Sequence, residues 1–390
     1  MNKALIFLLI LAGVWGPAGI AAADWDSVNR DVIEVYARGE YKTALGLAQK
    51  ALTVSKEEFG ASHANTAKSH NNLGLILKQL GQYERAARHY RKSLAIRKSL
   101  SGEGSLAATT SMNNLAQLLK TMGRYAEAET LLMESLRIRL ANLPPQHPHV
   151  MTSRNNLAGL YLVKGAYDRA ERIYLTVLQD CRESGNRDIR LAQALNNLAS
   201  VKIAQQEYVA ALEMQRKALG LARELLPYRH PLIAAYMQNL ALCLEQTGDY
   251  KEAEAYAENA VDILEDIHGP DHPAVAKALN NLAGINHKQG QFADAIGRYS
   301  RSLEIIKQKF GAEHPEAIKV CNNLAVGYIE KGNYEQARKI LSGAVEYDSS
   351  YLRNSDGLLK SILDSLIKCC DELGKTSEAK AYRQRLDKLK

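Results

Sequence analysis

The side chains whose type and spacing could do chemistry are amides that recur along the chain. Asn-Asn pairs occupy residues 71–72, 113–114, 155–156, 196–197, 280–281 and 322–323, and Gln238-Asn239 fills the one gap. Successive pairs are 41 or 42 residues apart. An amide offers both a donor and an acceptor, which suits the backbone of an extended peptide whatever its sequence. The pattern therefore favours binding over catalysis.

The two amides of a pair should have different roles, because neighbouring side chains on a helix point about 100° apart. The second position is asparagine in all seven inner copies, and it stands beside a core leucine. We expect this second asparagine to hydrogen-bond the backbone within the stack, since a buried amide needs partners. A role in ligand contact is the alternative. The first amide is the better candidate for touching a ligand.

Lysines flank the first amide on the same helix face, where residues three before and four or seven after it lie together. Lysine adds charge-assisted hydrogen bonds to carboxylates, so an acidic partner would suit this face. The alternative is that the lysines are merely solvated, as long charged side chains on helices often are. The candidate contact residues are Lys68, Asn71, Lys78, Asn113, Gln117, Lys120, Asn155, Asn196, Lys277, Asn280, Lys319 and Asn322.

The elements that carry these residues repeat with the same period. Most units have a glycine ten residues after their start, an aromatic two residues later and an alanine three beyond that, as in Gly81, Tyr83 and Ala86. Apolar residues at helical spacing on both sides of the glycine predict two helices per unit, with the glycine as a left-handed cap. Nine units are expected, starting near residues 29, 71, 113, 155, 196, 238, 280, 322 and 364. Gln206 replaces one glycine, so we expect an irregularity near residues 181–207.

Histidine-proline pairs precede several of the first helices, at residues 147–148, 230–231, 272–273 and 314–315. Proline suits the first position of a helix, where it loses no hydrogen bond. The histidines are one repeat apart and should not converge on one metal ion. We therefore predict a capping or loop-packing role for them.

The order of these motifs resembles the tetratricopeptide repeat, in its 42-residue kinesin-light-chain variety. Asn71-Asn72-Leu73-Gly74, then Gly81-Gln82-Tyr83, then Tyr90 to Leu94 follow that family's motif, and the match covers about residues 25 to 385. The resemblance implies an all-α, right-handed superhelical solenoid. It also implies a concave groove lined by the first helix of each unit, and a role in protein–protein contact.

Motifs for catalysis or cofactor binding are missing from the sequence. We find no glycine-rich phosphate loop, no G-x-S-x-G and no H-E-x-x-H, so we predict no enzyme, cofactor or metal. Carboxylates such as Glu252 and Glu254 should belong to exposed, salt-bridged helix faces. The five cysteines lack ligand spacing, and buried free thiols are expected, although Cys369 and Cys370 could form a strained bridge.

Charge and the N-terminus bear on partners and location. The net charge is +7, or +6 without residues 1–23, which hold one lysine and no acid, and no basic stripe predicts nucleic-acid binding. Residues 1–23 read as a cleaved signal peptide, with an uncleaved anchor as the alternative. We therefore expect an exported, periplasmic or secreted scaffold at residues 24–390, with no membrane span after cleavage. A peptide or protein should occupy its groove, and an acidic one would suit the lysines. Assembly of an envelope complex through convex or end surfaces is the alternative function.

Overall fold

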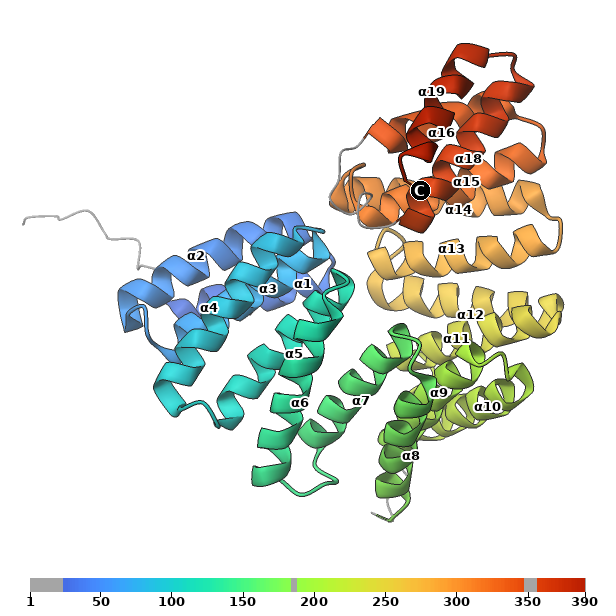
Figure 1. Ribbon diagram of the computed structural model, residues 1–390. Coiled ribbons are helices and arrows are strands. Elements are labelled where there is room, and N and C mark those ends of the chain that lie inside the picture. The colour runs from blue at the N-terminus through green and yellow to red at the C-terminus, as the bar shows by residue number, and fades with distance from the viewer. Residues whose placement is uncertain (1–23, 184–187, 347–355, 390) are drawn as a thin grey trace, which may run out of the picture.

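The computed structural model describes residues 24–183, 188–346 and 356–389, and the predicted signal peptide lies outside these ranges. The described chain is helical throughout, and its helices form nine antiparallel pairs (Figure 1). The pairs are α1 (Trp25–Ala37) with α2 (Tyr41–Phe59), α3 (Ala64–Gln79) with α4 (Tyr83–Ser101), α5 (Leu106–Thr121) with α6 (Tyr125–Asn142), α7 (Pro148–Val163) with α8 (Tyr167–Glu183), α9 (Ile189–Ala204) with α10 (Tyr208–Leu225), α11 (Pro231–Thr247) with α12 (Tyr250–His268), α13 (Pro273–Lys288) with α14 (Phe292–Phe310), α15 (Pro315–Glu330) with α16 (Tyr334–Glu346), and α18 (Asp356–Glu372) with α19 (Thr376–Asp387). The all-α solenoid expected from the repeat is confirmed.

Histidines begin five of the first helices. The imidazole Nδ1 of His147, His230, His272 and His314 accepts a hydrogen bond from the backbone N–H two residues later, at 3.1–3.2 Å. His63 does the same at the start of α3, without a following proline. The ring thus satisfies one of the donors that a helix start leaves open. The predicted capping role is confirmed.

Glycines in the left-handed region end the first helices, as predicted. Their φ angles lie between 70° and 84° at the eight repeat positions that carry glycine. Gln206 keeps the same turn with φ 64°, the one positive φ at a non-glycine residue in the described ranges. This unit therefore keeps the same turn, with the strain of a left-handed conformation at a non-glycine residue.

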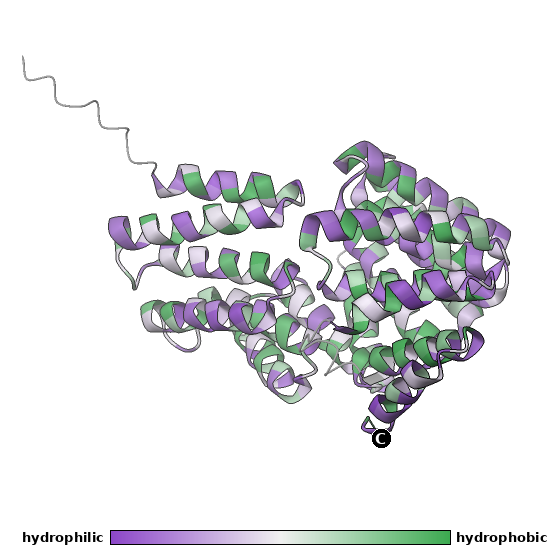
Figure 2. Cartoon of the chain, turned by 90° about the horizontal axis from the view of Figure 1, so that it is seen from above, coloured by the Kyte–Doolittle hydropathy of each residue, from purple (hydrophilic) through white to green (hydrophobic). Residues whose placement is uncertain are grey.

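The core lies between the helix layers, and its tightest points are the repeat alanines. The alanine three residues after each turn aromatic has no exposed surface. The second helix of the unit therefore packs closely on its neighbours at this point. Figure 2 shows apolar and polar residues mixed along each helix, as expected for elements that bury one stripe and expose the other. All five cysteines are buried, as the sequence predicted.

A ladder of amides joins successive units. The Nδ2 of each second asparagine donates to the side-chain oxygen of the first amide 43 residues earlier, as in Asn72 to Asn29, Asn114 to Asn71 and Asn156 to Asn113, at 2.8–2.9 Å. The same bond joins Asn239 to Asn196, Asn281 to Gln238 and Asn323 to Asn280, at 2.7–3.1 Å. The second asparagine is thus structural, but the predicted backbone partner was wrong. Its partner is an amide side chain, because stacking brings the two columns side by side.

The ladder is interrupted once. Asn197 makes no bond to Asn155, whose Oδ1 is buried and has no hydrogen-bond partner among the described residues. Asn197 instead accepts a 3.4 Å hydrogen bond from its neighbour Asn196. The connection before this unit is one residue short, and Gln206 lies within the same unit. The structure therefore places an irregularity where the sequence predicted one, between α7–α8 and α9–α10.

The stack curves far enough for distant units to touch, so that the ends of α1–α3 meet those of α13–α15 (Figure 1). The His314 Nε2 is 2.9 Å from the carbonyl oxygen of Gln79, and His272 hydrogen-bonds the backbone of Ala37. The rings of Tyr41 and Phe310 stack with centroids 5.5 Å apart. We call this contact the seam. It adds a long-range interface to an array in which units otherwise contact their neighbours.

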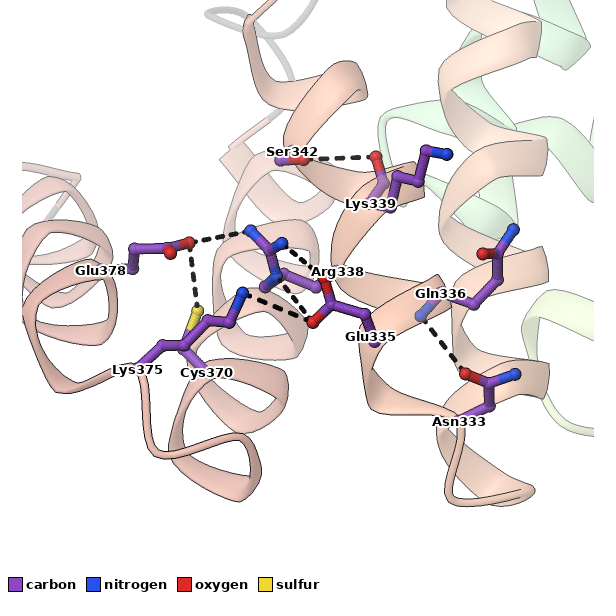
Figure 3. A network of polar contacts seen from close by, with 9 residues as sticks. All are labelled: Asn333, Glu335, Gln336, Arg338, Lys339, Ser342, Cys370, Lys375 and Glu378. Atoms are coloured by element: carbon purple, nitrogen blue, oxygen red, sulfur yellow. Dashed lines mark hydrogen bonds and ion pairs between the residues drawn. The ribbon is translucent and has the colours of Figure 1, made fainter.

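Ion pairs decorate the outer surfaces, as the sequence predicted for the carboxylates. Arg338 of α16 binds both Glu335 and Glu378, the latter on α19, at 2.7 and 3.0 Å (Figure 3). Glu252 pairs with Arg216 rather than with the adjacent lysine. Such exposed pairs contribute little stability individually, but they join helices of successive units. No described helix combines the length and apolar character needed to span a membrane.

Candidate functional site: the amide face

The predicted contact residues lie on one face of α3, α5, α7, α9, α13 and α15, which we call the amide face. It consists of the first amide of each unit and the residues three before and four or seven after it. The structure brings these residues together in two groups. Lys78 and Lys120 lie near each other on α3 and α5, and Lys277, Asn280 and Lys319 line one cavity at the seam.

The ladder fixes what the first amides can offer. The Oδ1 atoms of Asn71, Asn196 and Asn280 accept from the next unit, at 2.7–3.0 Å. Their NH2 groups, which can only donate, are the part left for other contacts, and that of Asn196 already donates a 3.4 Å bond to Asn197. The amide face is therefore a donor surface, which suits carbonyl and carboxylate oxygens of a bound segment.

Asn113 does not take part in this surface. It is 4% exposed, and its Nδ2 donates to the carbonyl oxygen of Thr109 at 2.7 Å and to Ser135 Oγ at 2.5 Å. Its Oδ1 accepts from Asn156. Both ends of this amide are thus used inside the stack. The sequence placed Asn113 among the contact residues because its position in the repeat matches Asn71.

Lys78 and Lys120 form the basic part of the amide face. Both side chains are half-buried, and none of the described carboxylates forms an ion pair with either ammonium. Burial lowers the pKa of both lysines, and the charge of Lys78 lowers the pKa of Lys120 further. Two like charges with reduced solvation and no counter-ion favour an external anion.

The neighbouring unit gives this pair room. A Cβ added at Gly159 of α7 would lie 3.7 Å from Lys120 Nζ and 3.6 Å from the hydroxyl of Tyr174. Burial raises the pKa of Tyr174 to about 12, so its phenol stays protonated at neutral pH. The unpartnered Oδ1 of Asn155 belongs to the same helix. The side chain of Lys120 therefore reaches α7 at Gly159, where the next unit has no side chain.

The remaining predicted residues have other surroundings. The Nζ of Lys68 lies over the ring of Trp25, 5.3 Å from its centroid. Lys319 pairs with Glu316 at 2.9 Å, and Asn322 accepts a 3.4 Å bond from Ser361. Gln117 is partly buried on α5, between Asn113 and Lys120 in sequence. These residues border the two groups without adding a further cluster.

Sequence reasoning missed Glu245. It occupies the same repeat position as Lys78 and Lys120, seven residues after Gln238, and burial raises the pKa of its carboxyl. The charge of Lys288 opposes that increase. The signal is present in the spacing, because the unit that begins with Gln238 has an acidic residue where two other units have a lysine. The amide face thus carries positive charge at α3–α5 and a carboxyl at α11.

A stability measurement can test the unmatched charge of Lys120. Because burial lowers its pKa in the folded state, the charged ammonium opposes folding at neutral pH. We expect Lys120→Met to raise the free energy of unfolding by about 0.5–2 kcal/mol, measured by urea denaturation at pH 7. The exposed Lys50→Met is the control and should change it by less than about 0.5 kcal/mol. Loss of stability in Lys120→Met would show that the ammonium has a favourable partner.

Comparisons with known proteins agree with this architecture. The tetratricopeptide repeat family matches residues 32–99, 86–141, 105–183, 149–224, 190–266, 231–308 and 274–350. No curated protein matches the chain. These matches extend over most of the described helices, and repeats of this family typically form protein-interaction scaffolds.

Solved structures with the same fold include two Rap proteins. A Rap protein complexed with competence and sporulation factor has 15% identity and a TM-score of 0.56, with 94% of this chain and 97% of that chain covered. The apo form of RapI has 17% identity and a TM-score of 0.52, with 73% and 98% covered. BtubC from P. vanneervenii has 21% identity and a TM-score of 0.45, with 62% and 93% covered. At these identities the Rap structures show a shared fold alone. With its family match over residues 32–350, the chain belongs to the tetratricopeptide repeat family.

Proposed function

We propose that this protein binds an acidic peptide segment along its amide face, as an interaction scaffold without catalytic activity. The observation that carries the proposal is the Lys78–Lys120 pair, which is half-buried and has no carboxylate partner among the described residues. A Rap protein of the same fold was solved in complex with competence and sporulation factor, which supports a binding role. Export, proposed from residues 1–23, would place this activity outside the cytoplasm.

The chemistry of recognition follows from the donors. The NH2 groups of Asn71 and Asn196 would donate to backbone carbonyls of an extended segment. The ammonium groups of Lys78 and Lys120 would bind its carboxylates, with charge-assisted hydrogen bonds that are stronger than neutral ones. Glu245 would repel an acidic residue at the α11 end. The proposed partner therefore carries its acidic residues at the α3–α5 end.

Fluorescence anisotropy with a labelled peptide of alternating glutamate and leucine tests the proposal. The double variant Lys78→Gln, Lys120→Gln should bind this probe at least about 100-fold more weakly, since each of the two charged hydrogen bonds contributes about 1.5–3 kcal/mol. The Lys50→Gln control should bind like the unaltered protein. A probe with glutamine in place of glutamate should bind weakly to all three proteins.

A second candidate function is assembly through the outer helices. Met133 of α6 and Leu175 of α8 are 53% and 45% exposed at equivalent positions of successive units. Exposed apolar residues in adjacent units are a feature of protein interfaces. If the lysine variants retained full binding, and Met133→Lys with Leu175→Lys removed it, the outer surface would be the binding site.

A further inference from the structure

The seam contains a cavity of about 580 Å³, between the first two units and the seventh to ninth. Tyr41 and Gln79 line it from the first turn of the superhelix, and Lys277, Asn280 and Phe310 line it from the second. The volume is that of a small-ligand pocket. Neither turn alone provides all of its walls.

The seam is a repeated contact rather than a chance approach. His272 and His314 are 42 residues apart, and so are the backbone groups of Ala37 and Gln79 that they bond. In both histidines Nδ1 accepts the capping N–H, so Nε2 carries the proton and donates to the other turn. Burial lowers the pKa of His272 to about 4, which keeps its ring neutral at pH 7. Two successive units thus lie in register on two others.

The polar groups of the cavity favour an anion. Lys319 and Glu316 pair with each other at 2.9 Å, so their charges offset. Lys277 is exposed, and none of the described carboxylates forms an ion pair with it. The Oδ1 of Asn280 accepts from Asn323, which leaves its NH2 as a donor into the cavity. A cation and an amide donor together suit a carboxylate.

The other walls are apolar. Ile306, Phe310 and Val320 line the cavity together with Leu358 from α18. Burying apolar area contributes about 25 cal/mol per Å², so these walls favour an apolar body attached to the anion. We propose that the seam cavity binds a carboxylate with an apolar body, held between the two turns of the superhelix. A free small acid and the C-terminal residue of a peptide share this chemistry.

Calorimetric titration of the whole chain tests the proposal and separates the two sources. Decanoate is the probe for a free acid, with decanol as its uncharged counterpart. N-acetyl-Ala-Leu-Phe with a free carboxylate is the probe for a peptide terminus, with its amide as the counterpart. We expect at least one carboxylate probe to bind at least ten times more tightly than its counterpart. If neither does, the proposal is wrong.

Two variants locate the site. Lys277→Met should weaken the favoured probe about 10–100-fold, while Lys251→Met, exposed and outside the cavity, should leave it unchanged. Gly39→Ala, which disturbs the seam, should weaken the probe, and Gly123→Ala, at an equivalent turn with no neighbour, should not. Undiminished binding in Lys277→Met or in Gly39→Ala would overturn the assignment. The carboxylate probes report on the seam cavity and the glutamate–leucine peptide reports on the Lys78–Lys120 pair, so failure of this proposal and failure of the proposed function are distinguishable.

Discussion

Replacing Gly39 with alanine will open the seam, whereas the same replacement at Gly123 will leave it closed. Both glycines end a first helix with φ near 74°, so both alanines carry the same left-handed strain of about 1–2 kcal/mol. A Cβ at Gly39 would lie 2.8 Å from Pro273 Cδ and 2.9 Å from the His272 ring. A Cβ at Gly123 meets nothing within 4 Å. The difference between the two variants therefore isolates the contact between turns.

The expected size of this difference comes from overpacking, which typically costs about 1–3 kcal/mol. Because the seam joins units that are not neighbours, the chain can relieve the clash by separating the turns without unfolding a unit. Small-angle X-ray scattering should give a larger radius of gyration for Gly39→Ala than for Gly123→Ala. Equal radii for the two variants and the unaltered protein would mean that the seam does not hold the turns together.

Asn156→Ala will destabilise the protein, whereas Asn197→Ala will have little effect. Asn156 donates to the Oδ1 of Asn113 at 2.9 Å, and Asn113 is 4% exposed. Its removal leaves a buried acceptor without a partner, which costs about 1–3 kcal/mol. Asn197 holds the same repeat position but makes no bond to Asn155, the first amide of the preceding unit. Its loss should change the free energy of unfolding by less than about 0.5 kcal/mol.

Urea denaturation of the two variants measures this contrast under identical conditions. The midpoint should fall in Asn156→Ala and stay within error in Asn197→Ala. Equal decreases would show that the asparagine supports its own helix and that the ladder between units contributes nothing. The pair is well matched because both residues are partly buried, both follow a first amide and both precede a buried leucine.

The helices and turns were predictable because each is specified locally and repeated. The turn glycine, the following aromatic and the fixed alanine recur in one register, and the structure has a left-handed turn at every such glycine. The missing glycine at Gln206 was visible in the same way. A single copy of the motif would have carried far less information than nine.

The partners of the amides were harder to predict. The strict second asparagine indicated a structural role, but its partner depends on how far one unit rotates on the next. That rotation brings residues 43 apart together and occupies the side-chain oxygen of the first asparagine, as at Asn71 and Asn280. Sequence spacing alone therefore assigned Asn113 to the surface, although its neighbours Ser135 and Ser153 bury it.

The seam could not be predicted from the sequence. Its two sides are 235 residues apart at His314 and Gln79, and each side uses a motif that recurs in other units. Whether a histidine meets another turn depends on the pitch of the whole superhelix, which sums small rotations over several units. Glu245, by contrast, was available from spacing, since it shares the position of Lys78 and Lys120.

The most direct test of the central claim is a lysine-labelling footprint of the protein with and without the glutamate–leucine peptide. Acetylation at each lysine would be followed by mass spectrometry at pH 8. If the acidic segment binds the amide face, Lys78 and Lys120 will lose reactivity when the peptide is present, and the exposed Lys50 and Lys251 will react as before. If Lys78 and Lys120 react equally fast in both samples while the peptide is bound, the amide face is not the binding site.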